Sequence, residues 1–341
     1  MKSKATPTKK TLDSTVAVID EIRQALVSSR RVLVATHLDP DGDAIGTQLA
    51  FGAYLRDLGK DVVMLRDSAI PDKYLFLRGV SNIIPVREFD GQDGFDTVVV
   101  LECPSPDRLG QVRQLIGGET NVVNIDHHKD STPFGSINWL DDSASSVGEM
   151  ACIFFKQVGY EIRPEVAEQL YTAILTDTGR FRYDSTTSQT MCLAGELIDL
   201  GADPHKICDM VYFDLRPSTM KLLGKVLNGI EFHKNGRVCL MTLSRKMLEE
   251  TKADEASAEG LVDNTMYSRG VVVGALLKET ENGQTRVSLR SNNGIDVSAI
   301  ARTFGGGGHF NASGCTLELE LEQARSKVLE VLFVAVDGEG A

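Results

Sequence analysis

The chain has 341 residues and a formal net charge of −12, and 42% of its residues are hydrophobic. This length allows two domains of ordinary size, and the apolar content excludes a largely disordered chain. The acidic balance argues against a protein that grips long duplex nucleic acid by neutralising phosphates, but it permits a small phosphorylated ligand where bound metal ions change the local charge.

The N-terminal stretch and the cysteines indicate a cytoplasmic protein. MKSKATPTKK is basic and no apolar segment of signal-peptide type follows it, so we interpret residues 1–11 as a disordered tail. No apolar run reaches the roughly 18 residues that a membrane span requires, and we expect no membrane association. The six cysteines are scattered without a CxxC pair, which argues against a disulfide framework or a zinc ribbon.

Strand and helix patterns alternate over residues 12–203. Short valine-rich runs predict buried strands at 31–36, 61–66, 95–102 and 121–126. Apolar residues at helical spacing predict helices at 44–59, 145–158, 164–178 and 188–200. This alternation favours an α/β domain with a doubly wound, mostly parallel sheet, and such sheets bind ligands beyond the carboxyl ends of their strands.

A second domain follows this alternating region. Short polar and proline-bearing stretches predict a linker with a hinge at 204–217. Beyond it we expect strands at 237–243, 270–279 and 285–291, and helices at 296–304 and 321–333. The mixture predicts a smaller α+β domain over residues 218–341, across a cleft from the first.

Side chains that can bind metal ions follow three of the predicted strands, and parallel strands end at one edge of a sheet. A further carboxylate, Asp177, lies near the end of a predicted helix. If they converge, the four carboxylates of Asp41, Asp43, Glu102 and Asp177 would resist joint ionisation without cations. The residues at the strand ends are His37, Asp41 and Asp43 in HLDPDGD, Glu102 after TVVVL, and Asp126, His127 and His128 in NIDHH.

Two divalent ions would balance the charge of these carboxylates. Mixed carboxylate and imidazole ligands suit Mn²⁺, with Mg²⁺, iron or Co²⁺ as alternatives, and a pair of ions roughly 3.5–4 Å apart would clamp a phosphoryl group and activate water. In this interpretation His127 is a ligand, His128 contacts phosphate, and Asp126 orients a ligand. A single strand-end histidine is usually structural and a single DGD is commonly a turn, but their occurrence at successive strand ends favours a metal site.

The second domain carries the glycine-rich sequence RTFGGGGHFNASG at 302–314. Consecutive glycines permit positive φ, and successive exposed N–H groups can form an anion-binding nest. A flexible turn is the simpler explanation, but the neighbouring arginine, serine and histidine favour phosphate or nucleotide binding. The residues concerned are Arg290, Ser291, Gly305, Gly306, Gly307, Gly308 and His309.

Together these motifs resemble those of the DHH phosphoesterase family. HLDPDGDAIG, VVVLECPSPDRLG, NIDHH and LTDTGRF are similar to its four motifs in order, and FGGGGHFNASG is similar to the glycine-rich motif of the associated C-terminal domain. Within the family, TDTGRFRYDSTTSQT and the compact length resemble the bacterial oligoribonuclease and pAp phosphatase branch. The resemblance implies a two-metal hydrolase of short RNA or 3′-phosphoadenosine 5′-phosphate (pAp), with a homodimer left open.

The resemblance also implies roles for individual residues. His37 and Asp41 would bind one ion, Asp43 and His127 the other, and Glu102 and Asp177 both. His128 and Arg108 would contact the substrate phosphate, and Asp126 would support them by orienting a neighbouring side chain. Arg290, Ser291 and the Gly305–His309 loop would hold the rest of the nucleotide.

Glu102 departs from the family pattern, which has aspartate at this position. Metal sites tolerate only about 0.2 Å in ligand distance, so the backbone or the rotamer must compensate for the extra methylene, or the metal pair is altered. Asp107 is an alternative ligand. Two other functions stay open: a phosphodiesterase for cyclic dinucleotides or their linear product pApA, and a non-catalytic nucleotide sensor with a weakened metal site.

Overall fold

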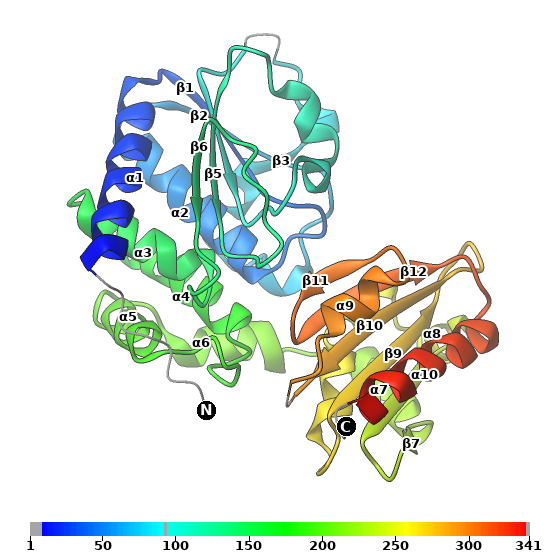
Figure 1. Ribbon diagram of the computed structural model, residues 1–341. Helices are drawn as coiled ribbons and strands as arrows, with labels where there is room; N and C mark the ends of the chain where they lie inside the picture. The colour runs from blue at the N-terminus through cyan, green and yellow to red at the C-terminus, as the bar shows by residue number, and fades with distance from the viewer. Residues whose placement is uncertain (1–8, 92–93, 293, 339–341) are drawn as a thin grey trace. The chain divides into compact units, whose positions relative to one another are not determined.

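The computed structural model describes residues 9–91, 94–292 and 294–338, without the side chains of residues 9–13 and 309. The chain divides into two units, Met1–Asp214 and Leu215–Ala341, and each is built on a six-stranded sheet (Figure 1). The predicted combination of an α/β domain with a smaller α+β domain is confirmed. None of the helices in the described part of the chain has the length and apolar character that a membrane-crossing helix needs.

The first unit contains a parallel sheet with the strand order β3-β2-β1-β4-β5-β6. Strands β1, β2 and β3 run from the centre of the sheet to one edge, and β4, β5 and β6 run from the other side of β1 to the opposite edge. Open parallel sheets bind ligands at this reversal, between the first strands of the two halves. The strands are β1 Arg31–Ala35, β2 Asp61–Arg66, β3 Ile83–Pro85, β4 Thr97–Leu101, β5 Asn121–Asp126 and β6 Ile137–Leu140.

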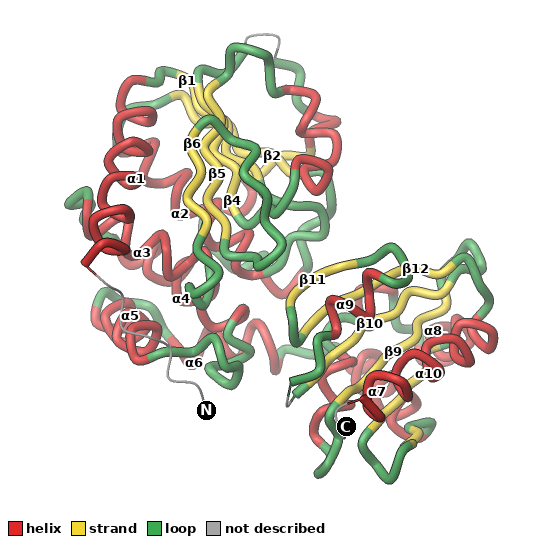
Figure 2. The backbone as a smooth tube through the Cα atoms, in the orientation of Figure 1, coloured by secondary structure: helices red, strands yellow, loops and turns green. Residues whose placement is uncertain are grey.

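Helices pack in a single core against one face of this sheet (Figure 2). Val32 and Val34 face these helices, whereas Leu33 and Ala35 face the 3₁₀ turns of Pro106–Leu115 and neighbouring loops. Burial on both faces explains why the central strands β1 and β4 are continuous apolar runs. The helices are α1 Lys9–Ser28, α2 Gly42–Asp57, α3 Val147–Gln157, α4 Pro164–Asp177 and α5 Ser188–Asp199.

Two of the predicted boundaries differ from the structure. Helix α1 begins at Lys9, inside the predicted tail 1–11, because Ile19, Ile22 and Leu26 recur at helical spacing and are buried; residues 1–8 lie outside the described part. The predicted linker 204–217 is largely helical, with α6 at Pro204–Cys208 and a π-helical turn at Asp209–Phe213. Proline at the first helical position and a capping carboxylate at Asp203 start α6 there.

The second unit contains a mixed sheet with the strand order β11-β12-β10-β9-β8-β7, in which only the β8–β9 pair is parallel. Helices α9 and α10 pack against one face and α7 and α8 against the other. Strands β8, β9 and β10 correspond to the three predicted strands. The elements are α7 Pro217–Asn228, β7 Glu231–His233, β8 Val238–Leu243, α8 Arg245–Thr251, β9 Val273–Glu279, β10 Thr285–Ser291, α9 Val297–Arg302, β11 Gly307–His309, β12 Ala312–Leu317 and α10 Leu321–Gly338.

Candidate metal centre

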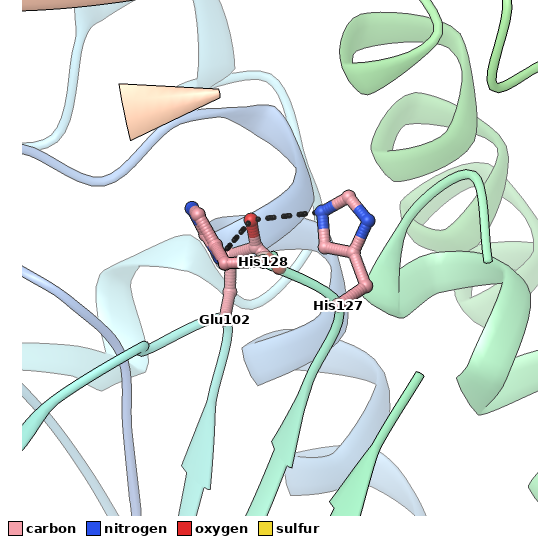
Figure 3. A group of neighbouring side chains, drawn as sticks. All are labelled: Glu102, His127 and His128. Carbon is pink, nitrogen blue, oxygen red and sulfur yellow. Dashed lines mark hydrogen bonds and ion pairs between the residues drawn. The ribbon is translucent and has the colours of Figure 1, made fainter. Parts of the chain in front are cut away.

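Two groups of metal-capable side chains meet where β4 and β5 end. Glu102, His127 and His128 form one group, and Asp43, His127 and Asp177 form the other; within each, one donor atom per residue lies within 4.8 Å of the others. Figure 3 shows the Glu102 carboxylate between the two imidazoles. Because His127 belongs to both groups, the five residues form one continuous cluster at the edge of the sheet.

His127 faces two carboxylates through one ring nitrogen. Its Nε2 lies 3.3 Å from Glu102 Oε1 and 3.2 Å from Asp177 Oδ2. Its Nδ1 lies 3.2 Å from the Ala144 carbonyl oxygen and can donate a proton to it, which directs the other ring nitrogen toward the carboxylates. Burial acts to lower the pKa of His127, but the charges of Glu102 and Asp177 raise it well above its usual value. This position therefore favours a positive charge, which a metal ion can supply in place of a proton.

Glu102 combines an unusual backbone with an unpartnered oxygen. Its φ is +54°, and its N–H still donates to Ile125 O at 3.0 Å, so the chain turns sharply one residue beyond the end of β4. The side chain is fully buried, and Oε2 has no hydrogen-bond partner among the described residues. Burial raises the pKa of Glu102 well above its usual value. An unpartnered buried carboxylate oxygen is unfavourable, and a cation would satisfy it.

The alternative ligand, Asp107, lies in a different environment. Its side chain is 85% exposed and forms an ion pair with Arg113. Asp107 therefore does not join either group, and Glu102 is the carboxylate that the second motif brings to the cluster.

Asp43 is held by the start of α3. Its side chain is fully buried, Oδ2 accepts from Val147 N at 2.6 Å, and Oδ1 accepts from Gly148 N at 2.8 Å. A helix N-terminus favours a negative charge, but burial and the charge of Asp177 raise the pKa of Asp43 to about 7. Each carboxylate oxygen has a second lone pair, so these two hydrogen bonds leave Asp43 able to ligate a metal ion.

Close packing of helices brings the carboxylates of α2 and α4 together. A Cβ at Gly42 would lie 2.4 Å from Thr176 Oγ1, and a Cβ at Gly148 would lie 2.7 Å from Ala173 Cβ. Glycine at both positions therefore lets the first turns of α2 and α3 approach the end of α4. Asp43 and Asp177 lie beside these contacts, which explains their convergence.

His37, Asp41 and Arg108 lie outside the two groups. His37 Nδ1 donates to Leu38 O at 2.6 Å, and its ring centroid is 6.4 Å from that of His128. The Asp41 carboxylate caps α2 by accepting a backbone N–H. Arg108 Nη2 donates to Leu38 O at 3.1 Å and lies 3.3 Å from His37 Nδ1. Neither His37 nor Asp41 joins the two groups, but the charge of Asp41 acts on Asp43, and the contacts of His37 with His128 and Arg108 place it at the same sheet edge.

His128 is oriented by Asp126. The two side chains are joined by a 2.8 Å hydrogen bond between Nδ1 and Oδ1, and the Ser131 hydroxyl also donates to Asp126. Burial acts to raise the pKa of Asp126, but the hydrogen bond and charge of His128, together with the hydrogen bond from Ser131, hold it below its usual value. Asp126 therefore stays ionised and fixes the ring of His128.

A buried network at the start of α3 was not predicted. Glu149 Oε2 accepts from Ser145 Oγ at 2.6 Å and from Thr190 Oγ1 at 2.7 Å. This network ties the beginning of α3 to α5, and the N–H groups of that same turn hold Asp43. The S-x-x-E pattern of Ser146–Glu149 is a sequence signal for this helix start, since Ser146 accepts from Glu149 N at 3.0 Å.

The residues expected to contact nucleotide in the second unit lie at the end of β10 and around β11. Arg290 Nε donates to Asp263 Oδ1 at 2.8 Å, and Ser291 Oγ donates to the Ile295 carbonyl oxygen at 2.6 Å. Both side chains are thus already fixed by partners within their own unit.

The glycine-rich segment is partly a strand rather than a loop throughout. Gly305 and Gly308 have φ of 75° and 134°, as expected for glycines in such a segment. Gly307–His309 pairs with β12 and forms the edge strand β11. The side chain of His309 lies outside the described part, so the structure does not test its predicted role.

Comparisons with known proteins agree with this architecture. Residues 31–174 match the model of the DHH family, N-terminal domain, and residues 235–333 match that of the DHHA1 domain. The bifunctional oligoribonuclease and PAP phosphatase NrnA of Thermus thermophilus is 34% identical over 308 residues, covering 88% of this chain and 89% of the relative. The protein of the same name from Bacillus subtilis is 28% identical over 294 residues, covering 84% and 89%.

A solved structure extends the similarity to the whole fold. The crystal structure of an exopolyphosphatase-related protein from Bacteroides fragilis is 25% identical and aligns with a TM-score of 0.86, covering 94% of this chain and 96% of that one. With both domain models matched in order and a relative above 30% identity along most of its length, the chain belongs to the DHH family and carries a DHHA1 domain after its DHH domain.

Proposed function

We propose that this chain is a divalent-metal-dependent phosphoesterase that hydrolyses short oligoribonucleotides and pAp. The observation that carries this proposal is the convergence of three carboxylates, Asp43, Glu102 and Asp177, around His127. It occurs in a chain that is 34% identical to a relative named for oligoribonuclease and PAP phosphatase activity.

The donor set fits two divalent ions. Carboxylate and imidazole ligands suit Mn²⁺, with Mg²⁺ or Co²⁺ as alternatives. The unpartnered Glu102 oxygen and the crowding of buried carboxylates both support this occupancy. When bound, the ions would polarise the phosphoryl group and lower the pKa of a water molecule. The proposed ligands are His37 and Asp41 for one ion, Asp43 and His127 for the other, and Glu102 and Asp177 for both.

His128 and Arg108 are proposed to act on the substrate phosphate. Asp126 keeps the His128 ring oriented, so the protonated imidazole can present its Nε2–H to a phosphate oxygen. Arg108 supplies a guanidinium at the same sheet edge, where it would offset phosphate charge. These two cations would complement the phosphate without replacing a metal ligand.

The rest of the nucleotide is proposed to contact the second unit. Arg290 and Ser291 supply side-chain donors, and the N–H groups of the glycine segment can approach a phosphate closely because no Cβ intervenes. The proposed residues are Arg290, Ser291, Gly305, Gly306, Gly307, Gly308 and His309.

The expected partner is a short RNA or small nucleotide in the cytoplasm. All six cysteines are free, and free thiols are typical of a reducing compartment. A homodimer remains a prediction from the resemblance.

A substrate panel tests the proposal. The full chain is assayed with pAp, RNAs of 2–5 nucleotides, pApA and pyrophosphate, each with Mn²⁺, Mg²⁺ or Co²⁺. We expect turnover of pAp and short RNA, and its loss in His127→Ala. The matched control is His205→Ala, since His205 is an exposed histidine on α6 that pairs with Asp209. Turnover of pApA alone would favour the dinucleotide alternative, and binding without turnover of any member would favour the sensor.

A further inference from the structure

Arg290 is anchored by a carboxylate that lies outside its own strand. Its Nε donates to Asp263 Oδ1 at 2.8 Å, and its Nη1 donates to the Leu289 carbonyl oxygen at 3.0 Å. Asp263 lies in the 3₁₀ helix Leu261–Tyr267, well before β10 in the chain. The two contacts leave the remaining guanidinium N–H groups, including those on Nη2, without a partner in the described part of the chain.

The 3₁₀ helix lies close to Arg290 because of a glycine on the neighbouring strand. Gly274 of β9 pairs directly with Arg290 of β10, so the two positions share one face of the sheet. A Cβ at Gly274 would lie 1.9 Å from Thr265 Oγ1. The missing side chain therefore lets the 3₁₀ helix rest on the sheet, and Asp263 reaches the guanidinium from there.

We propose that Asp263 is a positioning residue, which fixes the Arg290 guanidinium so that its remaining N–H groups can bind a phosphate of the nucleotide substrate. This inference rests on the proposed function, in which Arg290 contacts the nucleotide. Holding a long side chain in one rotamer costs up to about 2 kcal/mol of conformational entropy. An anchor that holds the guanidinium before the substrate arrives removes this cost from the binding step.

If the Arg290–Asp263 pair had only a structural role, its loss would change the stability of the fold and not the orientation of Arg290 for ligand binding. The side chains of Arg290 and Asp263 are 24% and 31% exposed. Partly exposed ion pairs contribute roughly 0–1 kcal/mol to stability. Loss of Asp263 should therefore change the fold little, and any large effect on ligand binding must come from the orientation of Arg290.

Kinetics on the full chain compare Asp263→Ala, Arg290→Ala and the double variant. We expect Asp263→Ala to raise the KM for pAp by about tenfold, with little change in kcat, and to have no further effect in the Arg290→Ala background. The matched control is Glu281→Ala, which removes an exposed carboxylate of the same unit that lies 3.2 Å from Arg245 Nη2. Hydrolysis of bis(p-nitrophenyl) phosphate, which has no second phosphate, should fall less than hydrolysis of pAp in the three Asp263 and Arg290 variants and stay unchanged in Glu281→Ala.

Calorimetric titration of pAp into the full chain with EDTA tests the inference without turnover. Asp263→Ala should weaken binding by about the same factor as it raises KM. An unchanged Kd in Asp263→Ala, additive losses in the double variant, or no binding of pAp to the wild type would each overturn the positioning role. If the wild type binds pAp in an Asp263-dependent way but hydrolyses no substrate of the panel, the proposed function is wrong and the positioning role stands.

Discussion

Replacing Glu102 with glutamine should separate metal binding from folding. Glu102 is fully buried and Oε2 has no hydrogen-bond partner in the described residues. Glutamine keeps the size of the side chain, and its amide oxygen can still accept from His127, so the stability of the metal-free protein should change by no more than about 1 kcal/mol. With metal bound, the wild type should be clearly more stable than Glu102→Gln, because an amide cannot supply the negative charge of a carboxylate ligand.

The size of the metal effect can be estimated from ligand linkage. Loss of a residue that only supports a metal ligand weakens metal binding roughly 10–100-fold, so loss of a ligand should cost at least about 100-fold. Metal at a hundred times its Kd stabilises the wild type by about 2.7 kcal/mol, but at the same concentration it would stabilise Glu102→Gln by only about 0.4 kcal/mol. The difference of about 2 kcal/mol corresponds to roughly 4–8 °C in the unfolding midpoint of a domain of this size.

The assay is thermal unfolding after EDTA treatment, followed by titration with Mn²⁺. Glu196→Gln is the control, because Glu196 is an exposed carboxylate of the first unit that pairs with Lys156 and belongs to neither ligand group. It should change the unfolding midpoint little and keep the metal-induced rise, since exposed ion pairs contribute only roughly 0–1 kcal/mol. A wild-type rise in Glu102→Gln would refute ligation by Glu102.

Three further predictions concern the metal, the start of α3 and the second unit. EDTA should abolish hydrolysis of pAp and Mn²⁺ should restore it, whereas EDTA-resistant activity would contradict the metal assignment. Asp43→Ala should destabilise the metal-free protein by about 2 kcal/mol in urea unfolding, because it leaves two buried N–H groups of α3 unpaired. Gly274→Ala should destabilise the second unit by about 1–3 kcal/mol through contact with Thr265, whereas Gly224→Ala, which has open space around its Cβ, should be neutral or stabilising.

The parts that could be predicted from sequence are those with local patterns. The valine-rich runs at 61–66 and 121–126 coincide with β2 and β5, because adjacent β-branched residues favour strands. The metal-capable residues follow such runs directly, so the parallel arrangement was sufficient to predict that Glu102 and His127 meet. Short strands such as β6, with the sequence INWL, carry too little pattern to be recognised.

The unpredicted parts of the site depend on backbone groups and distant contacts. Asp43 is held by N–H groups 104 and 105 residues away in the chain. Every residue except proline has such a donor, so no residue type marks these positions. Likewise, the carbonyl oxygen of Ala144 orients His127, although alanine has no functional side chain. These contacts depend on the close packing of helices at Gly42 and Gly148, which no local sequence pattern predicts.

The conformation of Glu102 supports a role in ligand binding rather than in folding. A positive φ costs an L-residue of this kind roughly 1–2 kcal/mol, and asparagine or aspartate tolerates it better than glutamate. The buried oxygen without a hydrogen-bond partner adds a second unfavourable term at the same residue. A shorter polar residue would reduce the cost of the positive φ, and an uncharged residue would reduce much of the cost of the unpartnered oxygen. Unfavourable local terms concentrate at functional sites, and a cation bound by the free oxygen of Glu102 would offset them.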